Sequence, residues 1–311
     1  MQPVITFIIC SYNRAHYLDD TLHSLLKSHN DPDFELLVVD NNSEDETSEV
    51  VKKYQKSINK DGKPIRYIKE TKQGLSHARN RGIDEADAPY IVFLDDDICA
   101  SESLIPAWIS FFDENPNAVA AGGKIQVQFD APRPSWMSHF LLPLLGHHDL
   151  GASPNTYPKD KYPFGGNMGF KKSVFEEVGY FDTNLGRKGK SLNAGEEKEL
   201  FRRIRENHND IYYVPDAFLY HRVGADRLTK DYIRKQALGL GQSMHFRLRE
   251  ASTPLKLKNW LSEVVKLVGS IPLAIGYLLA LQPAKAIMLF QFRKWIWEGY
   301  QANKSPNGSK D

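Results

Sequence analysis

Residues 91–100 read "IVFLDDDICA", and this stretch decides how the chain is interpreted. The apolar run 91–94 has the composition of a buried strand, and it ends in three consecutive carboxylates, Asp95, Asp96 and Asp97. Three adjacent negative charges repel one another, and burying even one of them is costly. A strand that ends in this way therefore needs a group that neutralises these charges.

The residues before this strand repeat a strand–helix pattern. Continuous runs of β-branched and aromatic residues predict buried strands at 4–10, 34–40, 65–70 and 90–94. A leucine-rich face predicts a helix after the first strand, and Ser43 with Glu46 forms a capping box for the second. Residues 75–86 predict the third helix. This alternation is typical of a mostly parallel sheet with helices on both faces, an α/β fold.

The pattern changes after residue 118. We expect a strand at 119–129, a loop rich in Pro and His at 130–163, helices at 172–179 and 196–206, a mobile loop at 185–195 between them, one or two strands within 211–221, and helices beyond. The predicted domains are 1–224, with halves at 1–120 and 121–224, and a helical extension at 225–311.

Charge and hydropathy single out the C-terminal extension. The whole chain has a net charge of +1, but residues 222–304 contain 14 Lys or Arg against 5 Asp or Glu, which favours an anionic partner. The apolar segment 267–281 contains Pro272, is too short to span a bilayer, and has basic and aromatic neighbours. It indicates either an interfacial membrane element at 255–300 or a helical hairpin packed on the domain or on a second subunit. Two cysteines, expected to be reduced, and an N-terminus unlike a signal peptide indicate the cytoplasm.

Polar residues follow all four predicted strands. They are 11–14, 40–43, the loop around Gly74, and 95–97. Helix caps also use Ser, Asn and Asp, but the carboxyl ends of parallel strands meet at one ligand-binding edge. Oxygen ligands suit Mg²⁺ or Mn²⁺, and Mg²⁺ usually bridges carboxylates to substrate phosphates. The sequence has no phosphate-binding loop of the ATPase type and no dinucleotide fingerprint after the first strand.

Seven short motifs occur in an order that resembles family 2 glycosyltransferases with a GT-A fold. They are "CSYNR", "VVDNNSEDET", "GLSHARNRGI", "FLDDDI", "GGNMGFKKSVFEEVGYFD", "GEEKELFRRI" and "YVPDAFLYH", and they span about residues 3–224. "FLDDD" alone also resembles the first motif of haloacid-dehalogenase phosphatases, which would use Asp95 as a nucleophile. That motif is expected near the start of the core, whereas here it follows three strand–helix units.

The resemblance implies a nucleotide-diphospho-sugar donor, most readily a UDP-sugar, and a divalent cation. It also implies that the half 1–120 binds the nucleotide-sugar and that the half 121–224 is the acceptor half, which carries the catalytic residues. By position, Asp40 corresponds to the residue that hydrogen-bonds the nucleobase, and Arg79 to a contact of the base or phosphates. Asp95, Asp97 and His221 correspond to metal ligands, with Asp95 also near the ribose. The other nucleotide-sugar-binding residues expected from this match are Ser11, Asn13, Asn42, Gly74 and Asp96. Strand-like alternation places Asp95 and Asp97 on one side and Asp96 on the other, where it would hold the loop by hydrogen bonds.

The catalytic base is expected in "GEE", residues 195–197. The family motif usually reads Gly-Glu-Asp, so the base by position is Glu197, with Glu196 orienting it or binding the acceptor. The change from Asp to Glu leaves open a catalytically idle nucleotide-sugar-binding protein. The adjacent histidines in "GHHDLG", residues 146–151, could form a metal cluster, although such pairs more often carry no metal.

The predicted function is inverting, metal-dependent transfer of a sugar to an acceptor hydroxyl, in the synthesis of a cell-surface polysaccharide or glycolipid. The acceptor would be a glycan or a lipid-linked glycan. The protein is expected in the cytoplasm, attached peripherally at the inner face of the membrane. No nucleic acid is expected as a partner. A homo-oligomer stays open. The neutralising charge for the three aspartates is expected to arrive with the metal and the donor.

Overall fold

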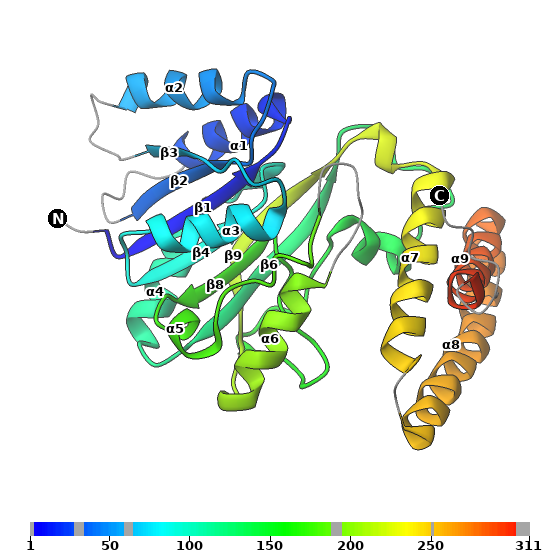
Figure 1. Cartoon of the computed structure of the whole chain (residues 1–311). Helices are drawn as coiled ribbons and strands as arrows, with labels where there is room; N and C mark the ends of the chain where they lie inside the picture. The colour runs from blue at the N-terminus through cyan, green and yellow to red at the C-terminus, as the bar shows by residue number, and fades with distance from the viewer. Residues whose placement is uncertain (1–2, 28–33, 59–64, 188–194, 250–251, 303–311) are drawn as a thin grey trace. The chain divides into compact units, whose positions relative to one another are not determined.

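The structure is a computed structural model that describes residues 3–27, 34–58, 65–187, 195–249 and 252–302. The chain divides into two compact units, and Figure 1 labels most of their elements. The first unit contains residues 1–128 and 146–222, and the second contains 129–145 and 223–311. The segment 129–145 therefore groups with the C-terminal helices, although it lies within the predicted acceptor half.

The first unit begins with three strand–helix repeats and a fourth strand. In chain order the elements are β1 (Ile5–Ser11), α1 (Ala15–Lys27), β2 (Phe34–Asp40), α2 (Thr47–Ile58), β3 (Ile65–Lys69), α3 (Leu75–Glu85) and β4 (Tyr90–Leu94). All pairings among these strands are parallel, in the order β3-β2-β1-β4. Every residue of β2 is buried, which explains why its sequence lacks polar alternation. The predicted pattern of this half is confirmed.

The strands beyond β4 pair in an antiparallel manner. The elements are β5 (Ile98–Ala100), α4 (Leu104–Glu114), β6 (Ala120–Phe129), β7 (Asn155–Thr156), β8 (Asn167–Lys171), α5 (Val174–Val178), α6 (Glu196–Asn207) and β9 (Tyr212–Val223). β8 pairs with both β4 and β6, the order continues β8-β6-β9-β5, and β7 pairs with β9. The predicted loop 130–163 contains β7 and a 3₁₀ helix, η1 (His139–Leu145). The sheet is thus parallel in its first half and mixed as a whole.

Alternate strand residues enter two separate cores, one on each face of the sheet. Phe7 and Ile9 pack in a cluster with α1, α2 and α4, whereas Ile8 packs in a second cluster with α3, α5 and α6. This two-sided burial is the expected consequence of side chains that alternate along a strand. It leaves the ends of the strands as the place where polar side chains gather.

The second unit consists mainly of helices, η2 (Ala225–Arg227), α7 (Lys230–Arg249), α8 (Thr253–Leu279) and α9 (Pro283–Ala302). The α7 and α9 backbones approach so closely that a Cβ on Gly241 would lie 2.0 Å from the Ile296 carbonyl oxygen. α8 packs on α9 through a small cluster that includes Ala274 and Leu289. Pro272 does not end α8, which continues through it and has 27 residues. By length and composition alone this helix could cross a membrane, whereas the apolar segment 267–281 was expected to be too short to do so.

Candidate active site

The polar residues after β1, β2 and β4 and before α3 gather at one edge of the sheet. The parallel register sets Ser11 beside Asp40 at the ends of β1 and β2. The Gly74 amide donates to Asn41 Oδ1 at 2.7 Å, which ties the start of α3 to the loop after β2. The expected convergence of the strand ends is therefore present in the structure.

Asp95, Asp97 and His221 form a compact group of potential metal ligands, with one atom from each lying within 4.8 Å of the others. Strand pairing brings them together, because Ile98 of β5 lies opposite His221 of β9 and the Arg222 amide donates to the Asp97 carbonyl oxygen at 2.8 Å. His221 Nε2 lies 3.3 Å from Asp97 Oδ1. Two carboxylates and an imidazole form a donor set that fits a divalent cation such as Mn²⁺.

Asp96 lies outside this group and is bound by the protein itself. Its Oδ2 accepts a hydrogen bond from Ser11 Oγ at 2.7 Å, and its Oδ1 lies 2.7 Å from Arg14 Nη1. Arg14 also reaches Asp97 Oδ2 through Nη2 at 2.6 Å. Burial nevertheless raises the pKa of Asp96 to about 7.

Arg14 corrects one expectation. Neutralising charge was expected to arrive only with metal and donor, but Arg14 already pairs with two of the three aspartates. An arginine in a loop gives no sign of this role in the sequence, because its partners lie more than 80 positions away. Ser11, expected to bind the nucleotide, is engaged with Asp96 in the structure.

The two loops expected to hold the nucleotide are joined to each other. The backbone N–H of Asn13 donates to Ser43 Oγ at 3.0 Å. Asn13 and Asn42 both have positive φ, 53° and 64°. Asp40 is buried, and its carboxylate accepts hydrogen bonds from the Ser43 amide and from the Tyr67 hydroxyl, at 2.8 and 2.6 Å. Non-glycine residues in the left-handed region mark strained turns, which are common at binding sites.

Arg79 holds the two glutamates of the "GEE" motif. Its Nη1 lies 3.0 Å from Glu196 Oε1, and its Nη2 lies 3.0 Å from Glu197 Oε1. The guanidinium is buried and also lies over the ring of Phe181, 5.3 Å from the ring centroid. Arg79 was expected to contact the base or phosphates of the nucleotide, whereas its two terminal nitrogens here join α3 to the start of α6.

The two glutamates differ in exposure. The side chain of Glu196 is 5% exposed and that of Glu197 is 25% exposed, so only Glu197 opens to solvent. Burial raises the pKa of Glu197, against the opposing effect of the Arg79 charge. A carboxylate with a raised pKa and an exposed edge is suited to accept a proton from a bound substrate.

Gly165 and Gly166, which the sequence interpretation did not single out, lie between the glutamate and the aspartates. A Cβ on Gly165 would lie 1.8 Å from Glu197 Oε1 and 2.4 Å from Arg79 Nη2, and a Cβ on Gly166 would lie 2.5 Å from Asp95 Oδ2. Consecutive Cα atoms are about 3.8 Å apart. Glu197 and Asp95 therefore contact adjacent residues of one short backbone segment. The two glycines of "GGN", residues 165–167, are the sequence signal that could have located this segment.

His148, the second residue of the histidine pair, has a structural role. His148 is buried, shares a hydrogen bond with the Tyr157 hydroxyl at 2.6 Å and stacks on Phe164. Burial lowers its pKa to about 4, so the ring is neutral at pH 7. The preceding Gly146 packs against the His221 ring, with a Cβ position 3.1 Å from Nδ1.

The expected mobile loop 185–195 falls largely on residues 188–194, which lie outside the described residues. Its first part is attached to α3, because the Leu75 amide donates to the Arg187 carbonyl oxygen and Ser76 Oγ donates to that of Leu185.

Comparisons with known proteins agree with this geometry. The family described as glycosyl transferase family 2 matches residues 6–179. A glucosyl-dolichyl phosphate glucuronosyltransferase of Haloferax volcanii is 26% identical over 242 residues, 77% of this chain and 75% of that protein. A poly-beta-1,6-N-acetyl-D-glucosamine synthase of Staphylococcus epidermidis is 27% identical over 58% of this chain, and the match spans 42% of its own length.

Two solved structures share the fold over nearly the whole chain. A mannosyltransferase from Pyrobaculum calidifontis, in complex with GDP-Man and Mn²⁺, has a TM-score of 0.61 and 18% identity, covering 98% of this chain and 89% of that one. Residues 1–349 of S. aureus TarS, in complex with UDP-GlcNAc, give a TM-score of 0.54 and 17% identity, covering 97% and 92%.

Proposed function

Because the chain belongs to glycosyl transferase family 2 and has the GT-A fold, we propose that it is an inverting, metal-dependent transferase acting on a nucleotide-diphospho-sugar. The observation that carries this proposal is the short backbone segment Gly165–Gly166, which contacts Glu197 on one side and Asp95 on the other. A base and a cation site that meet adjacent residues of one backbone segment can act on the same anomeric carbon in a single displacement.

In this reaction Glu197 accepts the proton of the acceptor hydroxyl as the new glycosidic C–O bond forms. The bond between the anomeric carbon and the diphosphate oxygen breaks on the opposite face, and the nucleoside diphosphate leaves with the electron pair. Arg79 opposes the rise in the pKa of Glu197 that burial causes, and it fixes the carboxylate of Glu197 beside that of Glu196. A divalent cation held by Asp95, Asp97 and His221 would supply charge stabilisation for the leaving diphosphate.

We propose that the donor nucleotide binds across the loops after β1 and β2. Asn13, Asn42 and Gly74 surround this edge, and Asp40 lies beneath it with Tyr67. A UDP-sugar is the expected donor. The two structural neighbours hold GDP-Man and UDP-GlcNAc, so a panel that contains both nucleotides is the direct way to identify it.

For the acceptor we propose a glycan or lipid-linked glycan at the cytoplasmic membrane surface. Curated relatives include the dolichyl phosphate enzyme and a Campylobacter jejuni enzyme named for a PP-undecaprenol substrate, which is 34% identical over 97 residues. The exposed apolar side chains of α8 support attachment of the second unit to a membrane.

The test is donor turnover by the full chain with and without Mn²⁺ or Mg²⁺. Asp97→Ala should abolish turnover, and Glu197→Gln should keep metal-dependent donor binding, seen as a thermal shift, while losing turnover. Donor binding by the wild type without turnover on any acceptor would instead support an idle binding protein. A covalent phosphate on Asp95 would support the phosphatase alternative, which the family match disfavours.

A further inference from the structure

The turn between α8 and α9 breaks a common rule for helix ends. The Gln282 amide donates to the Tyr277 carbonyl oxygen at 2.8 Å, and the Leu281 amide donates to that of Leu278 at 3.0 Å. These bonds form a Schellman motif, in which the residue at the position of Leu281 is usually glycine because it has positive φ. Here it is a leucine with φ 55° and a side chain that is 88% exposed.

The outer face of α8 continues this exposed apolar surface. Six large residues at intervals of three and four form one stripe, and each is at least 37% exposed: Leu257, Leu261, Val264, Val268, Ile271 and Ile275. Ser270 and Ala274, on the other side of the helix, are buried. The apolar stripe therefore faces away from α9, the reverse of the pattern expected for a helix at the surface of a soluble domain.

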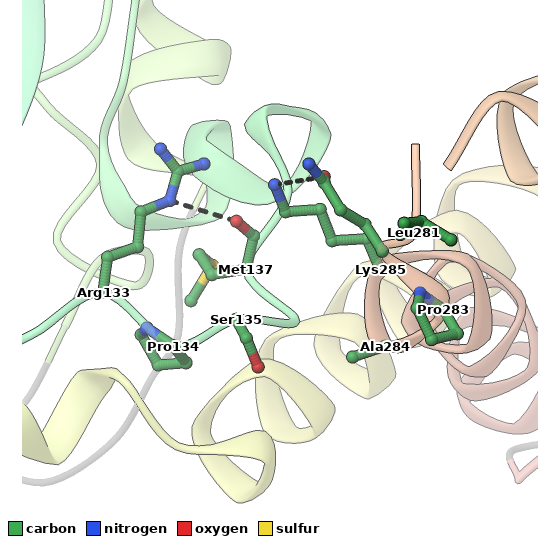
Figure 2. Close-up of a pocket in the computed structure, with 9 residues that line it drawn as sticks. Arg133, Pro134, Ser135, Met137, Leu281, Pro283, Ala284 and Lys285 are labelled. Atoms are coloured by element: carbon green, nitrogen blue, oxygen red, sulfur yellow. Dashed lines mark hydrogen bonds between the residues drawn. The ribbon is translucent and has the colours of Figure 1, made fainter. Parts of the chain in front are cut away.

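A half-open cavity of about 530 Å³ lies beside this turn. It is formed within the second unit by the loop residues Arg133, Pro134, Ser135 and Met137 and by the turn residues 281–285. Figure 2 shows Met137 between Arg133 on the loop and Lys285 at the start of α9. Two cationic side chains thus line a wall that is otherwise largely apolar, and none of the nine lining residues is an Asp or Glu.

Both cations keep donors that their hydrogen bonds in the cavity wall do not use. Arg133 donates its Nε to the Met137 carbonyl oxygen at 3.0 Å, and Lys285 donates to Gln282 Oε1 at 2.8 Å. A guanidinium has four further N–H groups and an ammonium two. Two such cations above apolar walls suit a phosphate attached to an apolar group.

From these observations we infer that the cavity between residues 133–137 and 281–285 binds the phosphate of a membrane lipid head group, with Leu281 inserted beside it among the acyl chains. The inference rests on the membrane attachment proposed above and specifies which residues recognise the lipid. Charge supports a lipid partner over a second copy of the chain, since residues 253–302 contain six Lys or Arg and two Asp or Glu. Two such surfaces would repel each other, whereas an anionic bilayer attracts them.

The bound state is one in which α8 lies along the bilayer surface. Glu263 and Lys266 are in the first half of the helix and pair with each other. A spanning arrangement would carry both into the hydrocarbon, which is costly. A surface arrangement leaves them in the head-group layer and immerses only the apolar stripe.

The test compares vesicles of equal zeta potential that contain phosphatidylcholine with either phosphatidic acid or oleate, so that only one type presents an added phosphate. The full chain should bind the phosphatidic acid vesicles about tenfold more tightly, because the phosphate accepts charge-assisted hydrogen bonds from two cations. The pair Arg133→Gln/Lys285→Gln should lose this preference. The matched pair Lys256→Gln/Lys258→Gln removes the same charge outside the cavity, so it should weaken binding to both vesicles and keep the preference.

Leu281→Gly provides a second test, because it should change thermal stability and vesicle binding in different ways. Glycine suits the positive φ, so the melting temperature should stay the same or rise, while binding to both vesicle types falls. The inference is overturned if the wild type shows no preference for phosphatidic acid, or if the Arg133/Lys285 pair retains it. Metal-dependent donor hydrolysis is measured on the same samples without vesicles. Its absence would count against the proposed transferase chemistry. It would not affect the result for lipid binding.

Discussion

Replacing Gly165 with alanine should disable the proposed base while leaving the fold intact. The new Cβ would lie 1.8 Å from Glu197 Oε1, and an ordinary contact begins at 3.4 Å. The carboxylate must therefore retreat by about 1.6 Å, and Arg79 Nη2, at 2.4 Å, must move with it. Both atoms end flexible side chains, so they can move without unfolding the domain. Misplacing a catalytic group by about 1 Å can cost on the order of 100-fold in rate, and a loss of at least that size in kcat is expected.

The assay is steady-state transfer or donor hydrolysis at saturating Mn²⁺, with kcat and the donor KM measured separately. The donor KM should change little, because the three atoms nearest to the new Cβ belong to Glu197 and Arg79 and not to the loops after β1 and β2. Gly269→Ala is the matched control. Gly269 lies on α8, in the second unit, and a Cβ added there meets nothing within 4 Å. In the Gly165→Ala background, Glu197→Asp should recover part of the lost rate, because its side chain is shorter by about one C–C bond. A Gly165→Ala enzyme with wild-type kcat would refute the assignment of Glu197 as the base.

Three further variants test the rest of the site. Arg79→Gln should raise the pKa of Glu197 further, because it removes the opposing positive charge. The acid limb of the kcat–pH profile should then move to higher pH, and an unmoved limb would contradict this. Arg14→Gln should cost about 3 kcal/mol of unfolding free energy by removing the cation that pairs with both Asp96 and Asp97, and Mn²⁺ should raise its melting temperature more than that of the wild type. Asn167→Leu should cost about 3 kcal/mol in urea unfolding, since the buried amide binds Trp108 Nε1 and the Ala217 carbonyl oxygen; a cost below about 1 kcal/mol would show that these bonds contribute little.

The parallel half of the fold was predictable because its signals are local. The run 36–39 is apolar without polar alternation, and this composition is typical of a strand buried on both faces. The antiparallel half depends on pairings between distant segments, such as Leu94 with Asn167 and Ile98 with His221. No short window of sequence contains that information, so the short strands β5 and β7 were not predicted.

The candidate site shows the same division. The aspartates could be located because they follow an apolar run and are of the residue type that binds cations, and the glutamates because "GEE" resembles the family motif. The groups that position them could not, because Arg14 is indistinguishable in sequence from a solvated loop arginine, and Gly165 matters only through the atoms that fill the space above it. Exposure was equally inaccessible, although it is what separates Glu197 from Glu196.

Arg14 gives the acidic run 95–97 a division of labour. Its guanidinium donates to one carboxylate oxygen of Asp96 and to one of Asp97. The other oxygen of Asp97, Oδ1, lies toward His221. An arginine cannot lose its charge at physiological pH, so this neutralisation persists whether or not a cation is bound. A divalent cation at Asp95, Asp97 and His221 then meets a site whose excess negative charge is already reduced. Its affinity should consequently depend on the phosphates that arrive with the donor, which is the behaviour expected of a site where metal and nucleotide bind together.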